Sequence, residues 1–146
     1  MNFMNALISN RAITIPALAW FIAQSLKVIS VIIKEKKIDF TRFVGSGGMP
    51  SSHASFIVCL AAVIGKHDGC NSSMFAIAFA VALIVMYDAA GVRRAAGKQA
   101  EVLNKLIFSH NDKMQFDENL KELLGHTPFE VVMGAALGIL MGVWLG

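Results

Sequence analysis

Residues 13–33 of the chain read ITIPALAWFIAQSLKVISVII. Only Gln24 and Lys27 interrupt this apolar run. Because about 20 apolar residues cross the roughly 30 Å hydrocarbon core of a bilayer, the run is long enough to span it. It stops at the charged residues 34–37, KEKK. This stretch therefore predicts a membrane-spanning helix.

The composition of the whole chain agrees with a membrane protein. Of its 146 residues, 55% are hydrophobic and only 16% are charged, against about 25% charged in an average soluble domain. The formal net charge is +3, but the basic residues flank apolar stretches, which is typical of membrane proteins and argues against a nucleic-acid partner. Cys59 and Cys70 lack the paired spacing of a disulfide framework or a metal site. The length predicts a single integral membrane domain, residues 1–146.

Three further segments complete the predicted fold. A helix that begins near Pro50 and runs to residue 65 is short for a span, at about 16 residues. Residues 72–87 follow after a turn and are expected to continue as a helix towards Asn104, and residues 128–146 form the last span. Residues 105–124 suit an amphipathic or loop segment outside the core. We expect an all-α, polytopic membrane helix bundle with about four transmembrane helices plus a cytoplasmic amphipathic segment.

The distribution of positive charge predicts the orientation. Four crossings place residues 34–52 and 88–127 on one side of the membrane. Ten basic residues lie on that side, against only Arg11 and Lys66 on the other: Lys34, Lys36, Lys37, Arg42, Arg93, Arg94, Lys98, Lys105, Lys113 and Lys121. The positive-inside rule makes the basic side cytoplasmic. We therefore expect a multi-pass protein of the cell membrane with its polar residues gathered at the cytoplasmic face.

The first polar cluster is GSGGMPSSH, residues 45–53. Backbone N–H groups in a glycine-rich nest, or at a helix start, bind phosphate oxygens. This pattern makes Gly47, Gly48, Ser51 and Ser52 candidate phosphate ligands, with His53 in the first turn facing the anion. An ordinary interhelical loop with a serine cap explains the same residues and stays open.

The second cluster comprises residues 88–99, where Arg93 and Arg94 stand among alanines and glycines. Arginine matches phosphate geometry with two parallel hydrogen bonds, although a basic flank of a span explains the pair equally simply. Asp88 supports the functional interpretation, because an acid at the membrane edge is costly unless it is paired. Lys27 either reaches this cluster or extends to the lipid headgroups.

The third cluster is LGHTPFE, residues 124–130. His126 and Glu130 are four residues apart and share a helix face, so the carboxylate can accept a hydrogen bond from one ring nitrogen. The other nitrogen is then free to act as a nucleophile. A histidine that caps a helix beside a partnered glutamate is the alternative.

Glycines recur every four residues in the last span, at Gly134, Gly138 and Gly142. Small residues at this spacing allow close helix packing. The sequence leaves open whether the partner helix belongs to the same chain or to a second copy in a homodimer.

Taken in order, residues 50–53, Arg93-Arg94 and residues 125–130 resemble the type 2 phosphatidic acid phosphatase and vanadium haloperoxidase superfamily. Residues 47–53, 88–99 and 123–130 are most similar to its divergent branch of small bacterial integral membrane proteins, which also has plastid members. The resemblance implies that His126 is the nucleophile, that His53 protonates the leaving group, and that Glu130 replaces the aspartate that orients the nucleophile. No cluster of carboxylates in the sequence suggests a metal site, so we expect a reaction without metal or cofactor.

The sequence departs from the motifs of the characterised phosphatases at three places. Ser52 replaces a glycine, Leu120 stands where those enzymes have an arginine six residues before the nucleophile, and the residue seven after Lys27 is Lys34 without the usual Arg-Pro. Arg93 and Arg94 are candidates to replace the missing arginines.

These observations support two principal hypotheses. The leading one is an acid-phosphatase-like phosphohydrolase that acts on a lipid or isoprenoid phosphate through a phosphohistidine intermediate. The alternative is a non-catalytic protein that binds or translocates phosphorylated lipid headgroups with the same basic cluster. A structural subunit that dimerises through the glycines is a third interpretation.

Overall fold

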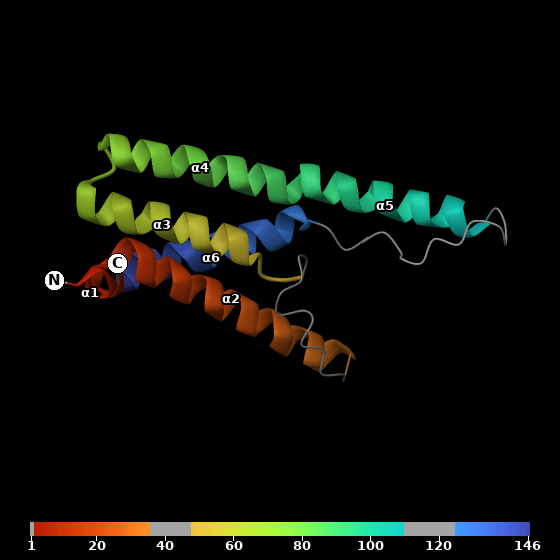
Figure 1. The fold of residues 1–146 in the computed structure, drawn as a ribbon, viewed down its shortest axis with the longest axis horizontal. Helices are drawn as coiled ribbons and strands as arrows, with labels where there is room; N and C mark the ends of the chain where they lie inside the picture. The colour runs from red at the N-terminus through yellow and green to blue at the C-terminus, as the bar shows by residue number, and fades with distance from the viewer. Residues whose placement is uncertain (1, 36–47, 110–124) are drawn as a thin grey trace.

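A computed structural model of the chain describes residues 2–35, 48–109 and 125–146, and it shows helices without strands in these ranges. The elements are α1 (Phe3–Ser9), α2 (Arg11–Glu35), α3 (Ser52–Asp68), α4 (Ser73–Ala90), α5 (Val92–Ser109) and α6 (Pro128–Leu145) (Figure 1). The predicted all-α class is confirmed.

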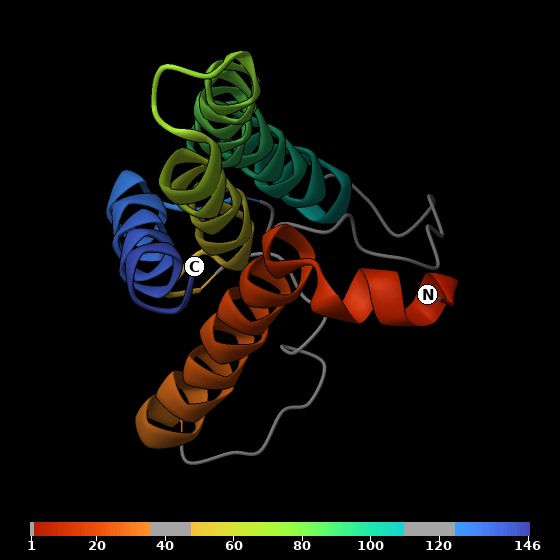
Figure 2. The same cartoon turned by 90° about the vertical axis from the view of Figure 1, so that its left-hand side faces the viewer.

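Helix α3 is the centre of the bundle. It packs against α6, α2 and α4, and Figure 2 shows these three helices arranged around it. Among the described helices, α1 contacts only α2, and it projects away from the others (Figure 2). The predicted helices are therefore present, and α3, the helix predicted to be short for a span, is surrounded by the other three.

Within the described residues, three helical stretches are long and apolar enough to cross a membrane. They are residues 11–33 of α2, residues 73–106 of α4 and α5, and α6. Large apolar side chains cover the outer surface, including those of Phe21, Ile84 and Trp144. Such a surface suits lipid rather than water. Helix α3 has 17 residues, about 25 Å at 1.5 Å per residue, and its neighbours cover most of it.

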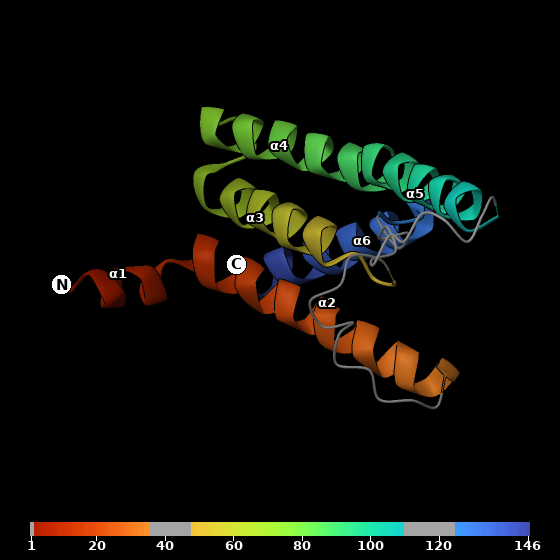
Figure 3. The ribbon, with the colours of Figure 1, turned by 45° about the vertical axis from the view of Figure 1, so that its right-hand side comes forward.

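The helix boundaries agree with the predicted ones to within a few residues, with one correction. Gly91 interrupts the helix that was expected to run on from residue 87. Its N–H donates to Tyr87 O at 2.8 Å and closes α4, and α5 continues in nearly the same direction beyond the bundle (Figure 3). The predicted amphipathic segment, residues 105–124, begins inside α5, and residues 110–124 lie outside the described residues.

The glycines of α6 face α3 of the same chain. A methyl group at position 138 would lie 2.9 Å from the backbone nitrogen of Cys59, and one at position 142 would lie 2.5 Å from the side chain of Ala62. Gly134 meets the backbone of Ser51 in the same way. The ridge is thus buried within the chain, and the face through which a homodimer was considered is already covered.

One end of the bundle collects the polar clusters. Helix α2 ends there, α3 and α6 begin there, and α4 passes into α5 there, while the two termini lie at the opposite end (Figures 1 and 3). This arrangement brings together residues that are far apart in the sequence.

Candidate active site

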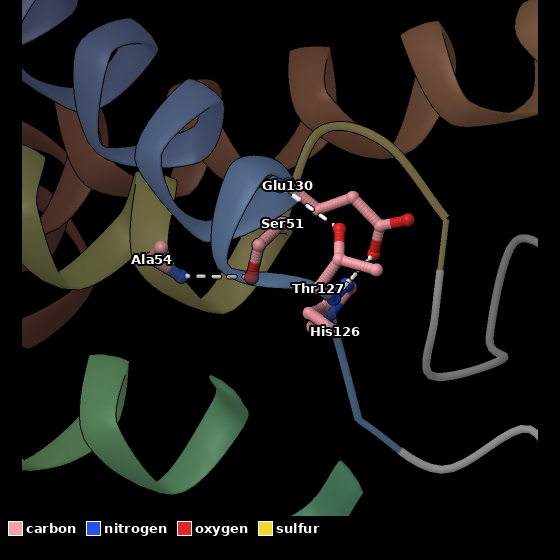
Figure 4. Close-up of polar contacts among 5 residues, drawn as sticks. All are labelled: Ser51, Ala54, His126, Thr127 and Glu130. Atoms are coloured by element: carbon pink, nitrogen blue, oxygen red, sulfur yellow. Dashed lines mark hydrogen bonds and ion pairs between the residues drawn. The ribbon is translucent and has the colours of Figure 1, made fainter. Parts of the chain in front are cut away.

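The start of α6 is built around Thr127 and Glu130. Thr127 is the N-cap, and its hydroxyl accepts a hydrogen bond from Glu130 N at 3.3 Å. The Glu130 carboxylate returns to accept from Thr127 N at 3.2 Å (Figure 4). This reciprocal capping box fixes the first turn, and Pro128 at the helix start favours the same geometry.

The same carboxylate oxygen also holds His126. Glu130 Oε2 lies 3.1 Å from His126 Nδ1 (Figure 4). Because a carboxylate only accepts hydrogen bonds, Nδ1 carries the proton and Nε2 carries the lone pair. His126 is only 3% exposed, and its Nε2 has no hydrogen-bond partner within the described part of the chain. The predicted pairing is therefore present, and Nε2, the nitrogen that the sequence makes the candidate nucleophile, is not used in it.

Gly125 brings His126 against the junction of α4 and α5. Its φ is +88°, a conformation that glycine adopts without strain. A methyl group there would lie 2.7 Å from Arg94 Cα. The N–H of the next residue, His126, donates to Ala89 O at 2.9 Å. Only glycine therefore allows this close approach, which the sequence did not reveal.

The histidine side chain opens into a small pocket between α3, α4 and α5. Its lining includes His53, Asp88, Arg93 and His126, together with Val85, Ala89 and Gly125. The pocket has a volume of about 20 Å³, which is room for one water-sized group. Residues from all three predicted clusters thus share one pocket.

Arg93 and Asp88 form an ion pair at the rim of this pocket. Arg93 Nε lies 2.5 Å from Asp88 Oδ2, and the two side chains are 50% and 36% exposed. An ion pair this exposed contributes at most about 1 kcal/mol. It can open at little cost and release the guanidinium to a ligand.

The start of α3 is tied to the start of α6. Ser51 is its N-cap and accepts from Ala54 N at 3.4 Å, as Figure 4 shows. Ser51 N donates to Glu130 O at 3.0 Å. The sequence left two uses open for Ser51, phosphate binding and helix capping. In the structure its hydroxyl caps α3. Ser52 is also buried.

Lys27 lies inside the cluster rather than at the headgroups. It is only 2% exposed, and a methyl group at Gly48 would lie 3.1 Å from its Cγ. Its charge acts on both His126 and Glu130. Of the two alternatives for this lysine, the structure favours the one that brings it to the site.

Burial favours the neutral form of His126. Desolvation lowers the pKa of the ring, and the Lys27 charge lowers it further, while the hydrogen bond to Glu130 opposes both. The net direction is below the ordinary value of 6.5. A neutral ring with its proton on Nδ1 is the form that can attack an electrophile.

The predicted site residues differ in their relation to the pocket. His53, His126, Arg93 and Asp88 line it. Glu130 pairs with His126, and Lys27 lies close enough for its charge to act on both residues of that pair. Arg94 contributes its backbone to the contact with Gly125, but its side chain is absent from the pocket lining. Gly47 lies outside the described residues. Within the described ranges, no group of three or more His, Cys, Asp or Glu side chains could hold a metal ion.

The fold and the pocket define a class: a multi-pass membrane protein that holds two histidines and an arginine at one end of a helix bundle. Residues 8–141 match the divergent PAP2 family. The chain belongs to that family, and the resemblance seen in its motifs is confirmed.

A relative of this chain is the uncharacterized membrane protein YuiD of Bacillus subtilis (strain 168). The two are 40% identical over 131 residues, which cover 82% of this chain and 83% of YuiD. No solved structure matches the chain. The relative and the three apolar helices together make this a membrane protein.

Proposed function

We propose that this protein is a metal-independent phosphatase that hydrolyses a lipid or isoprenoid phosphate through a phosphohistidine. The observation that carries the proposal is the ring of His126, which lines one pocket with His53 and Arg93. Its Nδ1 is held by Glu130, and its Nε2 is buried without a hydrogen-bond partner among the described residues. Membership of the divergent PAP2 family supports the same chemistry.

In the first step, the lone pair of His126 Nε2 attacks phosphorus. An N–P bond forms and the ester P–O bond breaks. His53 in its protonated form donates its proton to the leaving oxygen, so that an alcohol departs. Arg93 stabilises the negative charge on the equatorial oxygens. Glu130 stabilises the positive charge that develops on the His126 ring.

In the second step, neutral His53 accepts a proton from water. The oxygen of that water forms a bond to phosphorus, and the N–P bond breaks. Inorganic phosphate leaves, His126 Nε2 regains its lone pair, and His53 is protonated for the next cycle. The proton that His53 gave to the alcohol is thus replaced from the attacking water.

The pocket must widen to accept a phosphate. Its volume of about 20 Å³ suits one water-sized group, and a phosphate is larger. Arg93 is half exposed and lies at the rim. If its guanidinium left the Asp88 carboxylate and bound a phosphate oxygen instead, the pocket would open and the guanidinium would still have an anionic partner.

We also place this end of the bundle at the cytoplasmic face of the cell membrane. Ten basic residues against two support that orientation, and the described helices bring the polar clusters to one end of the bundle. The substrate headgroup would then be presented from the inner leaflet.

The test is phosphate release by the purified protein in detergent, with a chelator present. The substrates are phosphatidate, phosphatidylglycerophosphate and a polyprenyl diphosphate. Wild type should release phosphate and His126→Ala should not, although both should unfold at similar temperatures. Release that survives His126→Ala would contradict the mechanism.

A non-catalytic headgroup binder or translocator remains the second candidate. The half-exposed guanidinium of Arg93 favours it, because a headgroup phosphate can bind there without entering the small pocket beside His126. A binder should tolerate His126→Ala and should lose its affinity for phosphatidate vesicles in Arg93→Ala. A phosphatase requires both residues.

A further inference from the structure

An apolar groove runs from the candidate active site along the surface of the bundle. It is lined by Ala17 and Trp20 of α2, His53 and Phe56 of α3, and Val85 of α4, and its volume is about 430 Å³. This is about twenty times the volume of the pocket beside His126. The groove therefore has room for a group as large as a hydrocarbon chain.

The groove and the phosphate pocket adjoin each other. His53 and Val85 line both of them. The polar residues of the site, Asp88, Arg93 and His126, lie on the pocket side, whereas the groove side is formed by aromatic and aliphatic side chains. A ligand with a phosphate at one end and an apolar chain at the other matches this division.

The surroundings determine what can occupy the groove. Helices α2 and α4, which form its walls, belong to the stretches apolar enough to cross a membrane. Water has few partners on such walls, so hydrocarbon is the favoured occupant. The chain of a lipid whose phosphate already sits beside His53 is held close to the groove, so it enters in preference to the chain of a bulk lipid.

We propose that this groove is the substrate's chain-binding site, and that Ala17, Trp20 and Phe56 determine which chains are accepted. The inference rests on the proposed function for the position of the phosphate and adds where the rest of the substrate lies. His53 then marks the boundary between headgroup and chain, where the leaving oxygen must be protonated.

The chain offers its own control groove. A second apolar groove of about 320 Å³ lies between α2 and α6, with Leu26, Met133, Ala136 and Leu140 in its lining. None of the residues that line the phosphate pocket lines this groove. Bulk lipid should therefore occupy it without regard to headgroup.

Photo-crosslinking tests the site without requiring turnover. The probe is phosphatidate with a diazirine in its acyl chain, bound to the His126→Ala protein in detergent. Crosslinks should map to Trp20 and Phe56, and unlabelled phosphatidate should compete whereas phosphatidylcholine should not. Equal labelling of Leu140, or equal competition by both lipids, would overturn the proposal.

A kinetic test uses matched substitutions at two exposed alanines. Ala17→Phe fills the groove beside the site, and Ala136→Phe fills the control groove. We expect Ala17→Phe to lower the ratio of kcat/KM for long-chain over short-chain phosphatidate about tenfold, and Ala136→Phe to leave it unchanged. An unchanged ratio in Ala17→Phe, or an equal fall in both variants, would refute the assignment.

The two proposals fail in different ways. If wild type releases no phosphate from any substrate, the phosphatase is refuted, but selective crosslinking at Trp20 would still locate the chain of a bound lipid phosphate. If phosphate is released and the crosslinks are unselective, the groove assignment fails and the phosphatase stands.

Discussion

Glu130 has two roles that one pair of substitutions can separate. Its Oε2 accepts from Thr127 N in the capping box and from His126 Nδ1 in the site. Glu130→Gln retains an acceptor for the cap, because glutamine also occurs at this position of the box. We expect its free energy of unfolding to fall by less than about 1 kcal/mol.

The same substitution should impair catalysis severely. The introduced amide can donate to Nδ1, which moves the ring proton to Nε2 and removes the attacking lone pair. Replacing the orienting carboxylate in a serine hydrolase triad costs about 10⁴ in kcat through the wrong tautomer. Because the Glu130 side chain is 21% exposed, water can partly substitute for it. We therefore expect a loss of about 10²–10³-fold in phosphate release.

Thr127→Ala is the matched control. It removes the capping hydroxyl, which should cost about 1 kcal/mol of stability, and leaves the His126 ring and its partner in place. Activity per folded molecule should stay within about twofold. ¹⁵N shifts of the His126 ring report the tautomer directly and should change only in Glu130→Gln. If Glu130→Gln keeps wild-type activity, the orienting role is refuted.

Three further predictions concern pH, phosphate binding and packing. Only neutral His126 can attack, and burial lowers its pKa below 6.5, so a pH–rate profile should lose activity on the acid side with a midpoint below 6.5; a midpoint above that value would contradict the assignment. Arg93→Ala should lower kcat/KM about 10²–10³-fold. Lys98 is on the same helix but does not line the pocket, so Lys98→Ala should leave kcat/KM unchanged. Similar losses in the two variants would indicate a general effect of charge. Gly138→Leu should lower stability in detergent by about 1–3 kcal/mol or more, whereas the exposed Ala136→Leu should change it little; thermal unfolding distinguishes the two.

The helices could be predicted because their signals are local. An apolar run such as residues 13–33 identifies a span without knowledge of its neighbours. The helical hairpin of residues 50–65 and 72–104 could also be predicted locally, from the apolar composition of the two segments and the turn residues between them. The break at Gly91 could not be predicted, because glycine occurs both within membrane helices and between them.

The pairing of His126 with Glu130 was predictable for the same reason. Helix geometry alone places side chains four residues apart on one face. The sequence predicted only that His126 and Glu130 would lie at the same end of the bundle as Arg93 and Asp88. It could not predict how closely they approach, because a tertiary contact fixes that. Gly125 packs on the backbone of Arg94, and no residue type in either segment specifies that partner.

The role of the serines shows where a motif is ambiguous. Ser51 could bind phosphate or cap a helix, and both uses require an oxygen at a helix start. The structure uses it as the cap, with Ala54 N as donor. The burial of Lys27 was undecided for a similar reason, because a long side chain near a membrane surface can extend either way. The structure shows it packed against Gly48.

The balance of charge around the pocket bears on how the proposed site would attract a phosphate. Lys27 and Arg93 contribute two positive charges, and Asp88 and Glu130 contribute two negative ones, so the side chains alone supply no net attraction for a phosphate. The starts of α3 and α6 meet at this point through Ser51 N and Glu130 O. Each carries about half a positive charge from its aligned peptide dipoles. The cap of α3 uses Ala54 N and leaves the earlier N–H groups of Ser52 and His53 outside it. If the site binds phosphate as we propose, the backbone at these two helix starts should contribute to that binding together with Arg93, in place of the additional arginines of the related phosphatase motifs.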